Sequence, residues 1–361
     1  MNIAQIVRNG PAMYHAGRGI LKHLPALISP FKSPIIVTGE KSYHAFVKHY
    51  GEPPYPVYRY DKTASLEDMQ RIADAIGAEN SDLIIGIGGG KVLDTAKGVA
   101  ENLKAEIMFI PTVIGTCACA TPIAAVYHPD HSFRSVGYFH RSGYLTLADY
   151  DLLIESPREY FLSGISDTLA KWYEIEALTR KFERLPAMVC AARATAAVTR
   201  DILERDTEKA LQAMAEQTFH PAFADIVDSI FQIAATVGCF GCDNGRSAGA
   251  HAIHNALTIY PETHAIQHGI KVAYGILVQL IATGDEAEIE RLLPYYRNSG
   301  FIYQFAQLGI SEPIELASKK IAEIAASEKE TFRYIQPFSA DDIQQAILQL
   351  ECLTADFFNK V

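Results

Sequence analysis

The chain has 361 residues, 49% of them hydrophobic and 20% charged, and it carries a formal net charge of −10 at pH 7. At roughly 100–200 residues per domain, this length predicts two or three globular domains, each with its own core. The composition excludes collagenous, disordered and mucin-like proteins. The negative charge argues against nucleic acid as a partner, because it would repel the phosphate backbone.

The N-terminal segment has no basic stretch followed by an apolar one, so we expect a cytoplasmic protein without a secretory signal. Six cysteines are too few for a disulfide scaffold in a chain of this length, and we expect them to be reduced. Residues 107–127 carry no charge and are long enough to span a bilayer. Pro111 and Pro122 would break a helix there, so we interpret the stretch as a strand, a loop and another strand, and we expect no membrane partner.

From residue 34 onward, short β-branched runs alternate with helical patterns. The expected strands cover residues 34–38, 57–60, 82–87 and 106–111. The expected helices lie near residues 41–49, 66–77 and 91–103. This alternation predicts βαβ units on a parallel sheet, with a hairpin around residues 128–131 and a last strand near 145–148.

Beyond Pro157, Ala-rich segments place apolar residues three and four apart, which is the period of a helix. These segments cover residues 162–179, 188–203, 223–237 and 272–281. We therefore expect an α/β domain over residues 1–156 and an all-α domain over residues 157–361.

In the stretch Leu83-Ile-Ile-Gly-Ile-Gly-Gly-Gly-Lys-Val-Leu-Asp-Thr-Ala-Lys97, a strand runs into consecutive glycines and then into a helix. Bare backbone N–H groups and the positive end of the helix would face one point, which suits a pyrophosphate. The candidate binding residues are Gly88, Gly89, Gly90, Lys91 and Asp94. Asp94 and Lys97 are three apart and can pair on one helix face. The spacing fits neither the Rossmann fingerprint nor the P-loop, and an ordinary strand-to-helix turn is the alternative.

Histidines gather in one part of the second half. They are His251, His254, His264 and His268. His251 and His254 are three apart on a predicted helix and point to one side, and His268 can return to that side after a turn at Pro261. Neutral imidazoles with a carboxylate form a divalent metal site with open positions. Solvated or core histidines are the alternative.

The carboxylate for such a site cannot be assigned by spacing. Asp167 opens a predicted helix at the domain boundary, where an N-cap role alone would explain it. A competing zinc site would use four thiolates, from Cys117, Cys119, Cys239 and Cys242. The first pair is tighter than a zinc knuckle and the second follows an apolar helix, so core cysteines are the simpler interpretation.

Four motifs occur together along the chain. They are Gly88-Gly-Gly-Lys-Val-Leu-Asp-Thr-Ala-Lys97, Gly164-Ile-Ser-Asp-Thr-Leu-Ala-Lys-Trp-Tyr-Glu174, His251-Ala-Ile-His-Asn255 and Gln267-His-Gly269. In this order and spacing, the chain resembles the glycerol dehydrogenase group of the iron-containing alcohol dehydrogenase superfamily over nearly its whole length. The resemblance implies a dehydroquinate synthase-like fold: an N-terminal nucleotide-binding α/β domain, a helical domain, and a catalytic metal in the cleft between them. It also implies a homo-oligomer.

The resemblance also implies roles for single residues. Asp167, His251 and His268 would be the metal ligands, and His254 would stand beside them, close to the substrate. The residues implied to line the cofactor are Gly90, Lys91, Thr112, Val113, Ile114, Gly115, Thr121, Ile123 and Tyr127.

Two positions depart from the pattern of glycerol dehydrogenases. Cys117 stands where their loop carries an Asp that contacts the polyol, and the surrounding loop is more similar to the hydroxycarboxylate dehydrogenase branch, which reduces 2-oxo acids. Gly39 stands where NAD-preferring members carry an Asp that bonds the adenosine ribose. Without the carboxylate of that Asp, a 2′-phosphate on the ribose would not be repelled, and Lys41 would attract it. Glu40 is compatible with NAD. We therefore expect NAD or NADP as cofactor.

These observations lead to the hypothesis of a metal-dependent oxidoreductase. It would transfer a hydride between NAD(P)(H) and a small alcohol or carbonyl, with a 2-hydroxycarboxylate and its 2-oxo acid as the expected pair and glycerol or another polyol as the alternative. Zinc is the metal expected by resemblance, although the same ligands accept iron, nickel or cobalt. His254 is the candidate proton relay or, alternatively, a group that orients His251.

Three other classes of protein share some of these sequence features. A non-haem iron oxygenase uses two histidines and a carboxylate but has no use for the glycine-rich loop. A lyase of the dehydroquinate synthase type needs several basic residues for phosphorylated substrates, and the sequence has no such cluster near the histidines. A non-catalytic nucleotide-binding protein would be favoured if the purified protein bound the dinucleotide and no metal.

Overall fold

The computed structural model describes residues 7–77 and 80–360. Contacts divide the described chain into two compact units. One unit contains residues 7–161 and 209–239, and the other contains residues 162–208 and those from 240 to the end of the described chain. The domain boundary expected between residues 156 and 157 stays a prediction.

The first unit is built on a six-stranded parallel sheet with the strand order β1-β8-β5-β4-β2-β3. Its strands are β1 (Met13–Gly17), β2 (Pro34–Thr38), β3 (Val57–Arg59), β4 (Leu83–Gly88), β5 (Glu106–Pro111) and β8 (Leu145–Asp149). The antiparallel hairpin consists of β6 (Ile123–Tyr127) and β7 (Phe133–Tyr138). The predicted strands, their parallel arrangement and the hairpin are confirmed, whereas β1 was not predicted.

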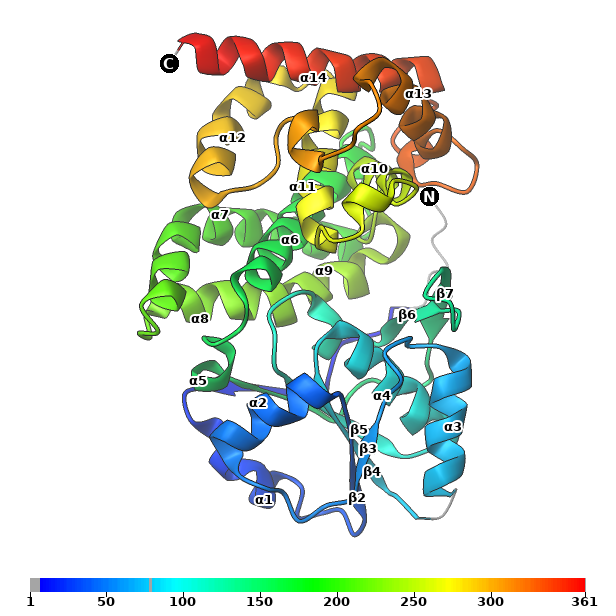
Figure 1. Cartoon of the computed structure of the whole chain (residues 1–361), viewed down its shortest axis with the longest axis vertical. Helices are drawn as coiled ribbons and strands as arrows, with labels where there is room; N and C mark the ends of the chain where they lie inside the picture. The colour runs from blue at the N-terminus through cyan, green and yellow to red at the C-terminus, as the bar shows by residue number, and fades with distance from the viewer. Residues whose placement is uncertain (1–6, 78–79, 361) are drawn as a thin grey trace. The chain divides into compact units, whose positions relative to one another are not determined.

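Helices cover both faces of this sheet, as Figure 1 shows. One face carries α1 (Leu24–Leu27), α2 (Glu40–Tyr50) and α5 (Tyr150–Leu153), and the other carries α3 (Leu66–Ile76) and α4 (Gly90–Leu103). Because both faces are covered, the central strands read as continuous apolar runs, and every residue of β4 is buried. A Cβ on Gly86 would lie 2.8 Å from Cβ of Ala96, so this glycine lets α4 lie directly against β4.

The remaining long elements are helices, as expected from the period beyond Pro157. They are α6 (Arg158–Thr179), α7 (Ala187–Ala215), α8 (Pro221–Asp228), α9 (Ala234–Gly241), α10 (Gly249–Leu257), α11 (His268–Ala282), α12 (Glu286–Ser299), α13 (Ile314–Ala325) and α14 (Ala340–Lys360). In the second unit α10 packs against α11 and α13, and α14 packs against α11 and α13. A π-helical turn at Ser229–Ile233 joins α8 to α9.

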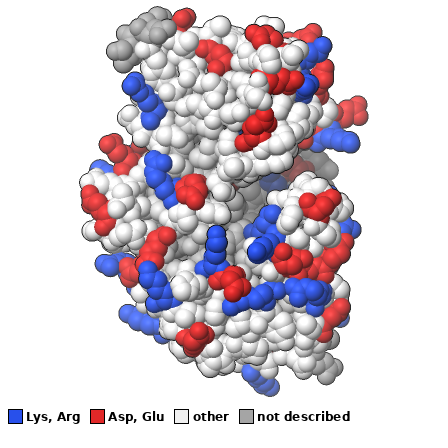
Figure 2. Space-filling view, in the orientation of Figure 1, with Lys and Arg blue, Asp and Glu red and all other residues white. Residues whose placement is uncertain are grey.

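One stretch, Pro221–Asn244, is apolar and long enough to cross a membrane by length and composition alone, and 56% of its most apolar window is buried inside the protein. Core helices of globular proteins have the same properties, so this single helix supports no membrane assignment. The stretch 107–127, which we expected to form a strand, a loop and a strand, contains β5, a short 3₁₀ turn at Cys117–Cys119, and β6. On the face shown in Figure 2, basic and acidic side chains are interspersed.

Candidate functional site

The glycine-rich loop joins β4 to the N-terminus of α4, as predicted, with Gly89 as the N-cap residue. A Cβ on Gly88 would lie 2.7 Å from Cβ of Val92, and one on Gly89 would lie 2.8 Å from the side chain of Val113. Any larger residue at these positions would collide with neighbouring side chains. The loop therefore exposes bare backbone next to the positive end of a 14-residue helix, which is the geometry that binds phosphate.

Lys91 supplies a positive charge in the first turn of α4. Its Nζ lies 4.7 Å from the ring centroid of Tyr127, and burial lowers the pKa of Lys91 from its ordinary value. No ion pair involves Lys91 in the part of the chain that the structure describes. The cation is held by an aromatic face and stays available to an anionic ligand.

The residues after β5 lie beside this loop. Thr112 donates its backbone N–H to the carbonyl of Gly88 at 3.2 Å, and Ile114 donates to the hydroxyl of Ser156 at 3.2 Å. Parallel neighbouring strands end at the same edge of a sheet, so the loops that follow β4 and β5 meet there. Cys117, the candidate substrate contact, begins the 3₁₀ turn of the same loop.

Asp94 and Lys97 pair as predicted, at 2.8 Å, and both are buried. Burial raises the pKa of Asp94, and the charge of Lys97 opposes this shift. The second oxygen of Asp94 accepts the backbone N–H of Ala125, and Lys97 donates to the carbonyl of Ile123. Both oxygens of Asp94 are thus engaged in fixing β6 against α4.

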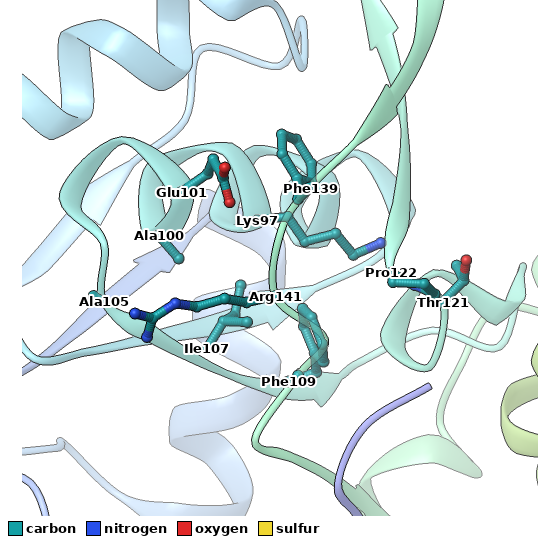
Figure 3. A pocket seen from close by; sticks show the side chains of 11 residues that line it. Lys97, Ala100, Glu101, Ala105, Ile107, Phe109, Thr121, Pro122, Phe139 and Arg141 are labelled. Carbon is teal, nitrogen blue, oxygen red and sulfur yellow. The ribbon is translucent and has the colours of Figure 1, made fainter. Parts of the chain in front are cut away.

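Figure 3 shows a narrow pocket beside Lys97, between Phe139 and Phe109. Its cavity volume is about 10 Å³. That space is on the order of one water molecule. It does not accommodate a cofactor or a substrate.

The second unit brings the predicted metal ligands together. Asp167 lies within α6, His251 lies in the first turns of α10, and His268 is the first residue of α11. Oδ1 of Asp167 is 3.2 Å from Nε2 of His251 and 3.4 Å from Nε2 of His268. Among the described residues, this is the one group of three or more His, Cys, Asp or Glu whose ligand atoms lie within 4.8 Å of one another.

The N-cap role considered for Asp167 is wrong, because α6 begins nine residues earlier, at Arg158. Pro157 precedes the helix and favours a start at that point. Asp167 instead projects from the body of α6.

These residues fit a divalent metal ion. Oδ1 of Asp167 is buried and has no hydrogen-bond partner, although two imidazole nitrogens approach it. Zinc bound at about 2.0–2.1 Å with tetrahedral geometry would hold its ligand atoms about 3.3 Å apart. The two measured separations agree with that value. The imidazole of His268 is 40% exposed, which leaves one side of the group open.

Electrostatics at this group favour a bound cation. Burial acts to raise the pKa of Asp167, but interactions with His251 and His268 hold it well below its usual range. Burial acts to lower the pKa of His251, but the charges of Glu174 and Asp167 outweigh it and raise the pKa to about 9. Glu174, which lies 2.8 Å from Nδ1 of His251, therefore adds a second negative charge beside the ligands.

His254 contacts His268 rather than His251. Its Nε2 lies 3.0 Å from Nδ1 of His268, and its Nδ1 donates to Oδ1 of Asn255 at 3.0 Å. Asn255 in turn donates to Glu330 at 2.9 Å. Burial, and then the charge of His268, hold the pKa of His254 well below its usual range. A neutral His254 accepts the N–H of His268 Nδ1, which leaves Nε2 of His268 free to face Asp167. His264, by contrast, lies outside the group and contacts the carbonyl of Thr258.

Comparison with known proteins agrees with this fold. The sequence model for "Iron-containing alcohol dehydrogenase" matches residues 11–150. "Hydroxycarboxylate dehydrogenase A" of Escherichia coli (strain K12) is 30% identical over 353 residues, covering 96% of this chain and 97% of that protein. "Glycerol dehydrogenase" of Thermotoga maritima is 31% identical over 286 residues, covering 77% of each. The solved structure of a probable glycerol dehydrogenase from Sinorhizobium meliloti 1021 superposes with a TM-score of 0.85 at 27% identity, covering 98% of this chain and all of that one.

The fold and these similarities define an oxidoreductase that acts on CH–OH groups. The chain belongs to the iron-containing alcohol dehydrogenase family. Members of this family use a nicotinamide dinucleotide and a divalent metal.

Several residues at these sites were not identified from the sequence. Glu174 stands in one of the family motifs, but nothing in the sequence indicates that its side chain reaches His251. Gln279 and Glu330 carry no local signal, because the groups that they bond lie far away in the sequence, at the start and on the body of α10. Arg59 and Tyr43, which line a cavity together with the predicted Lys41, were likewise missed.

Proposed function

We propose that the protein interconverts a small 2-hydroxycarboxylate and its 2-oxo acid with a nicotinamide dinucleotide as hydride carrier. The observation that carries the proposal is the convergence of Asp167, His251 and His268 on one point, in a chain that also has the glycine-rich loop. A divalent metal held by these residues, zinc in our proposal, would act as a Lewis acid that favours the alkoxide over the alcohol. Asp167 and the two imidazoles supply its ligands, and His268 leaves an open side.

The substrate class rests on two features. The relative that matches 96% of the chain is named for a hydroxycarboxylate. Lys171, one turn after Asp167 on α6, donates to the carbonyl of Arg246 at 3.2 Å, and its charge also helps to lower the pKa of Asp167. A cation beside the ligand group favours an anionic substrate over a neutral polyol. Glycerol is the second candidate, because other relatives of similar identity are glycerol dehydrogenases.

A direct screen tests the substrate proposal. We expect 2-oxobutyrate or 2-oxoglutarate to be reduced with a kcat/KM at least tenfold above that for oxidation of glycerol or 1,2-propanediol, each assayed with both dinucleotides at its favourable pH. The Lys171→Met variant should lose rate on the oxo acids and keep its rate on the diols. A wild-type preference for glycerol would replace the oxo-acid proposal by the polyol one.

For the dinucleotide, we propose that NADP(H) is accepted through Arg59. A Cβ on Gly39 would lie 2.8 Å from the ring of Tyr60, so there is no room for a ribose-binding carboxylate at that position. The guanidinium of Arg59 lies 4.1 Å from the ring centroid of Tyr43 and donates to the carbonyl of Gly39 at 3.2 Å. Arg59, Lys41 and Tyr43 line a cavity of about 430 Å³ at this edge of the sheet, together with the carboxylates of Glu40 and Glu52. An arginine there suits a 2′-phosphate.

Binding of nucleotide fragments tests the role of Arg59 without catalysis. In isothermal titration, we expect the Arg59→Gln variant to bind 2′,5′-ADP about tenfold more weakly than the wild type, because a charge-assisted hydrogen bond is lost. Its affinity for ADP should be unchanged. An equal loss for both fragments, or for neither, would contradict the proposal and leave NAD as the cofactor.

The remaining expectations stay predictions. His254 is the proposed proton relay, and its hydrogen bond to His268 places it beside the ligand group; its second bond, to Asn255, and its lowered pKa fit the alternative role of a residue that orients a ligand, here His268 and not His251. A homo-oligomer is supported by the exposed apolar side chains of β7, with Phe133 61% and Tyr138 49% exposed, and light scattering would measure it. The cytoplasmic location is proposed from the sequence alone.

A further inference from the structure

Two buried side chains cap the N-terminus of α10, the helix that carries His251. The first backbone N–H groups of a helix have no partner within the helix. At α10 they belong to four consecutive residues, Ala248, Gly249, Ala250 and His251. Oε1 of Glu174 accepts the first and the fourth, at 2.6 and 3.0 Å. Oε1 of Gln279 accepts the other two, at 2.9 and 3.1 Å.

The second oxygen of Glu174 binds the imidazole of His251. Oε2 lies 2.8 Å from Nδ1 of His251. A carboxylate only accepts hydrogen bonds, so Nδ1 must carry the hydrogen. When the imidazole is neutral, its lone pair is then on Nε2, the nitrogen that faces Asp167 at 3.2 Å. One carboxylate thus sets both the position of the helix end and the tautomer of the ring.

The contact with the imidazole of His251 explains why position 174 carries a Glu and not a Gln. Glu174 is 1% exposed, and in the described part of the chain no Lys or Arg forms an ion pair with it. A glutamine would accept the same two backbone N–H groups without placing a charge in the interior, which is costly. Gln279 does this at the same helix end, where its amide also donates to the carbonyl of Tyr173. What a glutamine cannot offer is an acceptor toward Nδ1 of His251 on its second arm.

We propose that Glu174 is a positioning residue for the metal site: it holds His251 as the Nδ1–H tautomer, with Nε2 free to bind a divalent metal. The inference rests on the proposed metal role of Asp167, His251 and His268. It adds a fourth side chain that touches neither metal nor substrate and acts through His251.

The Glu174→Gln variant of the full-length protein tests this role. Its Oε1 would still accept from Ala248 and His251, while its Nε2 would donate to Nδ1 of His251 and move the hydrogen of the ring to the other nitrogen. We expect zinc affinity, measured by competition with a chromophoric chelator, to fall by about 10–100-fold. The thermal unfolding temperature of the metal-free protein should remain close to that of the wild type. The visible spectrum of bound Co²⁺ should also change.

A matched control removes another bond at the same helix end. Thr331→Val deletes the hydroxyl that donates to the carbonyl of Ala248 and does not touch the ring. It should leave zinc affinity unchanged. If Glu174→Gln bound zinc as tightly as the wild type, the inference would be wrong while the metal site stood. If the wild type itself bound no zinc, the proposed metal site would be wrong, and with it the proposed function.

A measurement on the wild type keeps the inference testable if the variant does not fold. In the zinc-loaded protein with ¹⁵N-labelled histidine, long-range ¹H–¹⁵N spectra report which ring nitrogen of His251 carries hydrogen. We expect Nδ1–H with Nε2 bound to zinc. Zinc on Nδ1 would overturn the inference.

Discussion

Replacement of His268 by alanine is expected to remove hydride transfer almost completely. The change deletes one of two imidazoles that approach Oδ1 of Asp167, and it leaves a carboxylate and one imidazole, too few for a stable divalent site. Lewis-acid assistance lowers the barrier by several kcal/mol, so we expect its loss to reduce kcat/KM by about 10³-fold or more. Metal content after purification, measured by elemental analysis, should fall with it. The fold should persist, because the side chain of His268 is 40% exposed.

His264 provides the matched control for this experiment. It belongs to the same run of histidines, but its ring contacts the carbonyl of Thr258, away from the ligand group. His264→Ala should therefore keep both metal and rate. A His268→Ala protein that transferred hydride at the wild-type rate in chelator-treated buffer would exclude the metal role of the whole group.

The sequence predicted the sheet well because the signals for buried parallel strands are local. β2, β4 and β5 are runs of β-branched and apolar residues that end at, or just before, a Gly or Pro, and each needs no information from elsewhere in the chain. β1 was missed because Met-Tyr-His-Ala-Gly has no such run and is only partly buried. Its strand conformation comes from pairing with β8, far along the chain.

The part of the site that could be predicted from the sequence is the part that follows from the spacing of side chains along one helix. His251 and His254 share a helix, as their spacing indicated, but the two rings have different partners: His251 meets Glu174 and Asp167, and His254 meets His268. No periodicity within α10 indicates which partner each ring has, because the partners depend on how α6 and α11 pack against α10. Asp167 could be assigned only through the family resemblance for the same reason.

The start of α11 packs against α6 through a close approach at Gly269. Gly269, next to the ligand His268, lies so close to α6 that a Cβ would be 1.9 Å from the carbonyl oxygen of Ser163 and 3.0 Å from the backbone nitrogen of Asp167. Its own N–H donates to the hydroxyl of Ser163 at 2.9 Å. Because the obstacle is backbone, no side-chain rotation can relieve it. Gly269→Ala must therefore push the start of α11 away from the segment of α6 that carries Asp167.

We expect Gly269→Ala to lower the free energy of unfolding by about 2–3 kcal/mol, which for a chain of this length corresponds to a fall of roughly 3–4 °C in unfolding temperature. At a temperature where the variant is fully folded by circular dichroism, zinc affinity should also be at least tenfold weaker, because the ligands on α6 and α11 are forced apart. Gly241→Ala is the control, since a Cβ there meets its nearest neighbours, Ala192 and Ile175, at 3.4–3.5 Å, an ordinary contact. It should cost little stability and leave zinc binding unchanged. A Gly269→Ala protein that lost stability but bound zinc like the wild type would show that the approach of the two helices supports the fold and not the ligand geometry.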